Sequence, residues 1–196
     1  PVKTKAAPEV FSKLKELDAF FLNHHGFHIK ILRTDNGSEF KNKIFQSYCQ
    51  ENGILQQFTV PYSPQQNGVA ERLNQTLLNS IRSMLTHSKV SHSLWAEALQ
   101  TATYIKNRSP SAAIKENKTP FEILYKKPPA VSHFRIFGEI AYAVNNKSSR
   151  KKLQIKAHPL IFVGYSFNSP GYRLFDSLKL SIVIARDVSF PSTPMF

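Results

Sequence analysis

Apolar residues recur at helical spacing through the first half of the chain. Stripes at steps of three and four residues predict helices at 8–25, 41–52, 68–88 and 91–107. Two short apolar runs between them, at 28–33 and 54–60, predict strands. The polar stretch PYSPQQNG at 61–68 is bracketed by Pro and Gly, which predicts a loop. An α/β region is therefore expected first.

The pattern changes beyond Pro110. A segment interrupted by prolines, NKTPFEILYKKPPAVSHFRIFG, leads to four runs typical of strands, EIAYAV, PLIFVGYS, YRLFD and LSIVIARDVSF. We therefore expect a first domain at 1–108, a linker at 109–132 and a small β-rich domain at 133–196. Most of the aromatic side chains of the last domain are expected to fill a small barrel: Phe134, Phe137, Phe162, Tyr165, Phe167 and Tyr172.

Three single residues receive structural interpretations. Trp95 and Cys49 fall on the apolar stripes of their helices, so both are expected in the core. Asp18 lies inside an amphipathic helix next to Leu17, and we expect it at the surface. One cysteine excludes an internal disulfide, which agrees with a reducing compartment.

The charge balance narrows the partners. The chain has 26 Lys and Arg against 13 Asp and Glu, a formal net charge of +13, which favours nucleic acid. The alternative is that excess lysine only keeps a domain in solution. No apolar run is long enough for a membrane helix or typical of a signal peptide, so we expect an intracellular protein. Because the chain begins at Pro, we expect it to come from something longer.

Two carboxylates stand where a metal site is favoured. Asp35 ends a predicted strand, in RTDNGSEF, and Glu71 falls in the first turn of a long helix, with 35 residues between them. A helix N-terminus favours negative charge. Two hard oxygen ligands suit Mg²⁺ or Mn²⁺ better than zinc. The alternative is a pair of unrelated surface acids. His24, His25 and His28 cluster, but without a nearby cysteine they do not predict a zinc site.

Cationic and amide side chains near the two acids are candidates for DNA contacts. They are Lys41 and Lys43 after Asp35, Tyr62, Gln65, Gln66 and Asn67 in the loop, and Arg72, Gln75 and Arg82 on the long helix. A second candidate is the basic stretch KSSRKKLQIK, with Arg150, Lys151 and Lys152. The alternative for each is an ordinary solvated surface.

The succession of motifs resembles one family over nearly the whole chain. RTDNGSEF followed by PYSPQQNGVAERLNQTL resembles the catalytic core of integrases of copia-type long-terminal-repeat retrotransposons. NKTPFEILYKKPP, FRIFGEIAYAV, IFVGYSFNSPGYRLFD and IVIARDVSF are similar to the region that follows that core. The resemblance implies an RNase H-like core, N-terminally incomplete, followed by a small, mostly-β, SH3-like domain. It also implies a multimeric enzyme that acts in the nucleus after a cytoplasmic particle stage.

The resemblance implies a chemistry as well. Such enzymes trim element DNA ends and join the 3′-hydroxyls to target DNA with divalent ions, and Asp35 and Glu71 match the second and third acids of a three-acid set. The strand that carries the first acid, and the zinc module before it, have no counterpart here. We therefore expect a loosely held Mg²⁺ or Mn²⁺, no catalysis by this chain alone, and exposed apolar faces on the helices at 8–25 and 68–88. Alternatives are a non-catalytic nucleic-acid-binding protein derived from such an element, and an inert remnant.

Overall fold

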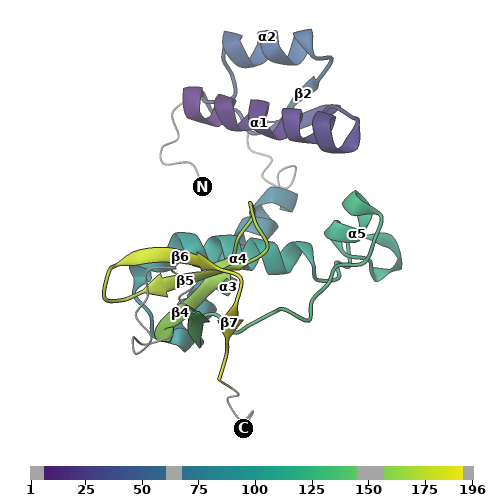
Figure 1. Ribbon diagram of the computed structural model, residues 1–196. Coiled ribbons are helices and arrows are strands. Elements are labelled where there is room, and N and C mark those ends of the chain that lie inside the picture. The colour runs from purple at the N-terminus through teal and green to yellow at the C-terminus, as the bar shows by residue number, and fades with distance from the viewer. Residues whose placement is uncertain (1–6, 61–67, 145–156, 192–196) are drawn as a thin grey trace. The chain divides into compact units, whose positions relative to one another are not determined.

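A computed structural model describes residues 7–60, 68–144 and 157–191, drawn as ribbons in Figure 1. The chain divides into two compact units, residues 1–74 and 75–196, and one long helix runs across their boundary. None of the helices within the described ranges is long and apolar enough to cross a bilayer.

The first unit pairs two strands with two helices. Its elements are α1 (Ala7–His25), β1 (Ile31–Thr34), α2 (Lys43–Glu51) and β2 (Leu55–Phe58). The strands run parallel, from Ile31 opposite Leu55 to Thr34 opposite Phe58, so α2 is the crossover between them. Asn42 caps α2 by accepting a hydrogen bond from the backbone N–H of Phe45 at 3.0 Å.

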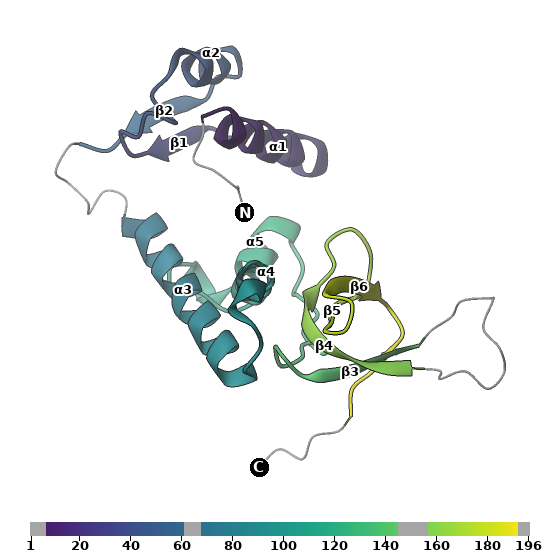
Figure 2. The same ribbon diagram turned by 90° about the vertical axis from the view of Figure 1, so that its left-hand side faces the viewer.

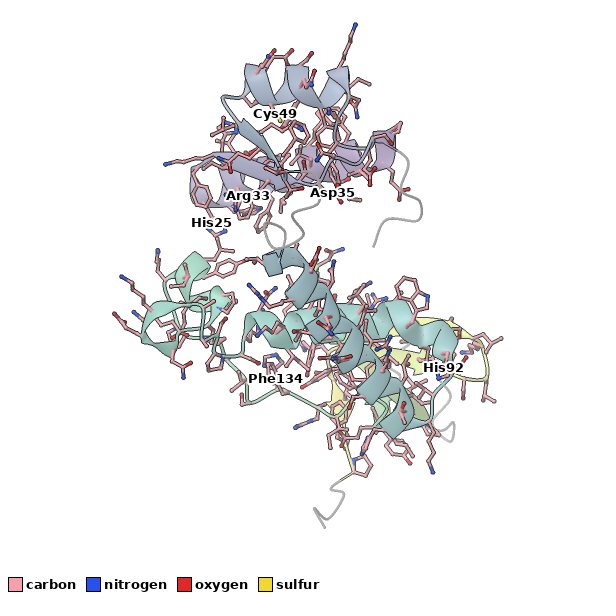
Figure 3. The ribbon with its side chains drawn as sticks, turned by 180° about the vertical axis from the view of Figure 1, so that it is seen from behind. His25, Arg33, Asp35, Cys49, His92 and Phe134 are labelled. Carbon is pink, nitrogen blue, oxygen red and sulfur yellow. The ribbon has the colours of Figure 1, made fainter. Side chains whose placement is uncertain are left out.

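Apolar side chains of α1 and α2 meet in the core of this unit. Leu14, Phe45 and Ile54 are buried, and the ring of Phe11 packs on Phe45 with centroids 5.2 Å apart. Cys49 is buried beneath α2, so its predicted place in the core is confirmed (Figure 3). Burial, with a smaller effect from Asp18, raises the pKa of the Cys49 thiol, as expected for a packing residue.

Asp18 corrects one prediction. It is only 2% exposed, because the loop that leads into β1 folds back over α1. Its carboxylate accepts hydrogen bonds from the backbone N–H of Ile29 at 2.8 Å and the hydroxyl of Tyr48 at 3.0 Å, and its Oδ2 lies 2.9 Å from Nδ1 of His28. The carboxylate thus joins α1, the loop before β1 and α2. The helical pattern around Leu17 does not reveal these contacts.

The second unit holds the rest of α3 and all later elements. The helices are α3 (Gly68–Ser88), η2 (His92–Leu94), α4 (Trp95–Asn107), η3 (Lys115–Asn117) and α5 (Pro120–Tyr125). The strands are β3 (Ile140–Val144), β4 (Ala157–Tyr165), β5 (Tyr172–Asp176), β6 (Ser181–Ala185) and β7 (Val188–Ser189). They form an antiparallel sheet in the order β6-β5-β4-β3-β7.

α4 packs closely on this sheet and lies between it and α3 in Figure 2. The hydroxyl of Thr101 donates a hydrogen bond of 2.8 Å to the carbonyl of Val163 on β4. A Cβ on the neighbouring Gly164 would stand 2.5 Å from that hydroxyl oxygen, so this position requires glycine. Ile81 and Leu85 of α3 and Ala98 of α4 complete the core against Val163.

The prediction for Trp95 is wrong, and Phe167 is an exception among the expected barrel residues. Trp95 is 51% exposed, because Leu94 of the preceding turn takes the buried position where α4 begins. Phe167 is 67% exposed, since β4 ends at Tyr165 and Phe167 lies in the loop after it. The other predicted barrel residues are buried or half-buried: Phe134, Phe137, Phe162, Tyr165 and Tyr172.

α5 was not predicted, although its capping signal is present in the sequence. Thr119 accepts a hydrogen bond from the N–H of Glu122 at 3.1 Å, and the Glu122 carboxylate accepts one from the N–H of Thr119 at 2.8 Å. Pro120 occupies the first turn. This capping box starts a short helix inside the expected linker.

The expected exposure of apolar residues on two helices is confirmed. On α1, Leu17 is 48% exposed and Leu22 41% exposed, and on α3, Val69 is 77% exposed and Leu73 45% exposed. Only the later part of α3, from Ile81, is buried.

The bonds of Asp18 generate a stability prediction for the first unit. Burial by itself raises the pKa of this carboxyl, but its hydrogen bonds with Ile29, His28 and Tyr48 outweigh burial and hold the pKa below its ordinary value. Asp18→Asn should lower the free energy of unfolding of this unit by about 1–3 kcal/mol, because it leaves a buried donor facing donors. Hydrogen exchange at the amide of Ile29 measures the loss.

The pH dependence and a matched control sharpen this test. A lowered folded pKa means that the stabilisation is complete above the unfolded value of 3.8 and is lost as the pH falls through the folded pKa. The difference in the free energy of unfolding between the wild type and Asp18→Asn should therefore vanish in acid. Glu16→Gln, in an exposed pair with Lys13 on the same helix, should change stability little. Equal effects of the two substitutions would contradict the role of Asp18.

Candidate functional site

Asp35 stands directly after β1, in a turn that is fixed to the neighbouring strand. The N–H of Thr59 donates to the carbonyl of Thr34 at 3.0 Å and extends the pairing of β1 and β2 by one step. Beyond it, the side-chain amide of Asn36 donates to the carbonyl of Thr59 at 2.7 Å. The residues on both sides of Asp35 are thus bonded to Thr59, directly after β2: Thr34 through its backbone and Asn36 through its side chain. The Asp35 carboxylate therefore projects from a fixed strand end.

The carboxylate of Asp35 is exposed and shapes its own turn. Its Oδ1 accepts a hydrogen bond from the N–H of Gly37 at 3.0 Å, the Asx turn expected for Asp before Asn-Gly. One backbone bond leaves the carboxylate with lone pairs toward solvent. Figure 3 labels Asp35 at this end of the strand together with Arg33.

Glu39 is a second acid at this turn, which sequence reasoning missed. A Cβ added to Gly37 would stand 2.6 Å from Oε2 of Glu39 and 3.0 Å from Oδ1 of Asp35, so both carboxylates border the open side of this glycine. The signal was the spacing Asp-Asn-Gly-Ser-Glu, in which a tight turn brings the first and fifth residues together. Oxygen ligands of this kind fit Mg²⁺ or Mn²⁺.

Lys41 and Lys43 lie in different surroundings. The carbonyl of Gly37 accepts from the N–H of Lys41 at 3.0 Å, and the ammonium of Lys41 lies 6.0 Å from the ring centroid of Phe58 on β2. Lys43 opens α2 and lines a shallow hollow of about 370 Å³ with Lys15 of α1. Only Lys41 therefore belongs to the turn that begins at Asp35.

Glu71 occupies the first turn of α3 and is exposed. Arg72, Gln75 and Arg82 are exposed on the same helix, and at 100° per residue they fall within about 80° of one another on one face. Arg82 donates to the Oδ1 of Asn79 at 3.4 Å on this face. The helix therefore presents an acid at its N-terminus and an arginine face along its length.

Other predicted site residues lie outside the described ranges. These are the loop residues Tyr62, Gln65, Gln66 and Asn67 and the basic residues Arg150, Lys151 and Lys152. Convergence of Asp35 with Glu71 stays a prediction, because the loop that joins their elements belongs to this set. Among the described residues, no three His, Cys, Asp or Glu side chains form a metal-binding group.

Comparison with known proteins places the chain among retroelement proteins. Residues 139–196 match the retroviral polymerase SH3-like domain. The chain is 41% identical over 186 residues to a retrovirus-related Pol polyprotein from transposon TNT 1-94 of Nicotiana tabacum, covering 95% of this chain. It is 29% identical over 162 residues to that from transposon RE2 of Arabidopsis thaliana, covering 83% of this chain. The chain spans only 14% and 11% of the lengths of these relatives.

A solved structure shares the arrangement of the elements. A chain of the simian T-cell lymphotropic virus intasome, in complex with PP2A regulatory subunit B56 gamma, aligns with a TM-score of 0.50 at 17% identity. The alignment covers 98% of this chain and 67% of that one. At this identity the likeness concerns the fold alone.

The bond between Asn36 and Thr59 generates a prediction for the turn. Asn36→Ala should release the Asp35 turn from β2 and weaken it by about 1 kcal/mol, since one hydrogen bond to the Thr59 carbonyl is lost. Hydrogen exchange at the amides of Gly37 and Thr59 should quicken. Ser38→Ala, in the same turn, is the control and should leave both rates unchanged. Unchanged exchange in Asn36→Ala would show that β2 does not fix the turn.

Proposed function

This chain belongs to the Pol polyproteins of copia-type retrotransposons, and from that premise we propose that it works in the integration of element DNA by metal-dependent polynucleotidyl transfer. It spans the integrase core-like α/β region and the SH3-like domain, so the fold class expected from the sequence is confirmed. The observation that carries the proposal is the exposed carboxylate of Asp35, held at the end of a strand by bonds to β2.

Asp35 and Glu71 are the proposed ligands of a divalent ion. Each is an exposed carboxylate at the end of a regular element, a strand for Asp35 and a helix N-terminus for Glu71. Mg²⁺ prefers such oxygen ligands and commonly binds one or two protein carboxylates together with phosphate oxygens of a substrate. When bound, the ion supplies activation of the attacking oxygen and stabilisation of the leaving one. The protein groups hold and orient the DNA end.

Two carboxylates do not complete the ligand set of this chemistry. We propose that residues 1–196 bind the ion loosely and do not catalyse strand transfer alone, and that a further Asp supplied upstream completes the site. The exposed apolar residues of α1 and of the first turns of α3 support this reading, because such faces require a covering segment. The proposed domain limits are 1–108 for the core, 109–132 for the linker and 133–196 for the β-rich domain.

DNA contacts are proposed for the exposed cationic and amide groups around the two acids. The arginine face of α3 and Lys41 suit phosphate oxygens, which carry no base information. The same role is proposed for Lys43, for the loop residues Tyr62, Gln65, Gln66 and Asn67, and for Arg150, Lys151 and Lys152. We propose further that more than one copy of the chain binds the element ends and the target DNA, and that the reaction takes place in the nucleus.

One feature favours a second function, non-catalytic binding of nucleic acid. The net charge of +13 attracts a polyanion without any metal ligand. The two functions differ in what the acids do, because binding through cations survives their loss.

Strand transfer on short duplex ends tests the proposal. With Mg²⁺ or Mn²⁺, residues 1–196 alone should be inactive, and the same chain extended upstream through a strand bearing an Asp should join ends. Asp35→Asn or Glu71→Gln in the extended chain should abolish joining, because each removes a charged ligand. Joining is measured as longer labelled strands on a denaturing gel.

Controls separate the two functions. Glu51→Gln, on α2, is the matched neutralisation and should leave joining intact. Salt-sensitive duplex binding that survives both active-site substitutions, with no joining by the extended chain, would support the non-catalytic function instead. Absence of duplex binding at low salt would contradict both.

A further inference from the structure

A cavity in the second unit is lined by none of the residues proposed above for metal or DNA contact, so the chemistry described above gives it no role. Its volume is about 360 Å³, and it lies where α4, the segment before β3 and the hairpin of β4 and β5 meet. Its principal lining residues are ring or polar side chains: Tyr104, His133, Tyr165, Ser166, Tyr172 and Arg186. A volume of this size suits one small ligand.

Hydrogen bonds fix the rings that line the cavity. The hydroxyl of Tyr104 lies 2.8 Å from Nε2 of His133, and the hydroxyl of Tyr172 donates to the carbonyl of His133 at 3.3 Å. The hydroxyl of Tyr165 accepts from the N–H of Arg135 at 3.1 Å. Because each of these three tyrosine hydroxyls is bonded to another segment, the rings that line the cavity are held in place before any ligand binds.

The ring surfaces are not equally available. Tyr104 stacks on Tyr165 with centroids 4.2 Å apart, and the guanidinium of Arg108 covers it at 3.5 Å from its centroid. Tyr165 is only 4% exposed. The half-buried rings of Tyr172 and His133 therefore supply the surface that a ligand can contact. They suit a flat aromatic group better than an aliphatic chain.

Charges around the cavity select the sign of the ligand. None of the described residues lining it is acidic, and Arg186 stands at its edge, 78% exposed and bonded through Nε to Asp187 at 3.3 Å. Burial, together with Arg108 and Arg135, lowers the pKa of His133, so the imidazole is neutral at neutral pH. A cationic side chain is disfavoured here, because the charged group beside the rings is the guanidinium of Arg186. A ligand that joins a neutral ring to an anionic group fits the cavity, with the ring beside Tyr172 and His133 and the anion at Arg186.

From this lining we propose that the cavity binds one unpaired nucleobase of a DNA strand, with the adjoining phosphate at Arg186. A base inside a duplex is stacked and paired on its edges, so only an unpaired base enters such a site. The inference rests on the proposed DNA-binding function and adds to it a preference for single-stranded ends. It assigns the β-rich unit a role in holding an end in which the last bases are unpaired.

The test compares two ligands on residues 1–196, a blunt duplex and the same duplex with a short single-stranded overhang carrying 2-aminopurine. Stacking of one base contributes enough to tighten binding about tenfold, so the overhang should bind about tenfold better. Its fluorescence should be quenched on binding. Ser166→Leu should remove both effects, since the larger side chain fills the cavity without deleting a core contact.

Matched variants control for folding. Ser181→Leu places the same substitution at an exposed position at the start of β6 and should keep the preference for the overhang. If Ser166→Leu lowers the melting temperature, Arg186→Gln decides, with Lys179→Gln as the matched loss of an exposed cation. Arg186→Gln should weaken the overhang complex more than the blunt one.

Several results would overturn the proposal. Equal binding of blunt and overhang duplexes overturns the cavity assignment alone, and absence of all duplex binding at low salt overturns the proposed function with it. A preference that persists in folded Ser166→Leu, or is lost equally in Ser181→Leu, also overturns the assignment. Binding of a polyproline peptide that Ser166→Leu abolishes, with no preference for the overhang, assigns the cavity to a peptide instead.

Discussion

The parallel pairing of β1 with β2 is the constraint on which the candidate site depends. Thr34 lies opposite Phe58, and the N–H of Thr59 and the side chain of Asn36 continue the contact past the strand end. Since α2 must cross between the strands, the turn after Asp35 cannot shift without breaking this register. The exposed acid Asp35 is thereby held in place, because the residues before and after it are both bonded to Thr59.

Buried polar groups stabilise the two units in different ways. In the first unit, the buried carboxylate of Asp18 has Ile29, His28 and Tyr48 as its hydrogen-bonding partners in place of water. Burial and the Asp18 carboxylate raise the pKa of Tyr48 to about 12, so the Tyr48 hydroxyl remains a donor. In the second unit, the hydroxyl of Thr101 bonds to the carbonyl of Val163 on β4, and the next residue must be Gly164 because a side chain there would collide with that hydroxyl. Both arrangements connect distant segments through bonds that fail if one partner is removed.

Patterns of apolar residues predicted most elements, because helices and strands bury one face each. They failed where tertiary contacts outweigh the local pattern. Asp18 is buried by a loop ten residues away in sequence, as its bond to His28 shows, and Trp95 is displaced from the core by its neighbour Leu94. The apolar pattern placed Asp35 at a strand end, whereas only the spacing of the turn Asp-Asn-Gly-Ser-Glu signalled Glu39. The periodicity of apolar residues within one element does not report contacts between residues that are distant in the sequence.

The central claim is that Asp35 and Glu71 hold one divalent ion, and paramagnetic broadening by Mn²⁺ tests it most directly. In an NMR titration of residues 1–196, the amides beside Asp35 and those of the first turn of α3 should broaden together, at the same Mn²⁺ concentrations. Asp35→Asn should abolish both. Broadening at Asp35 that leaves Glu71 and its neighbours sharp, or two sites that respond independently to the substitution, would contradict the account.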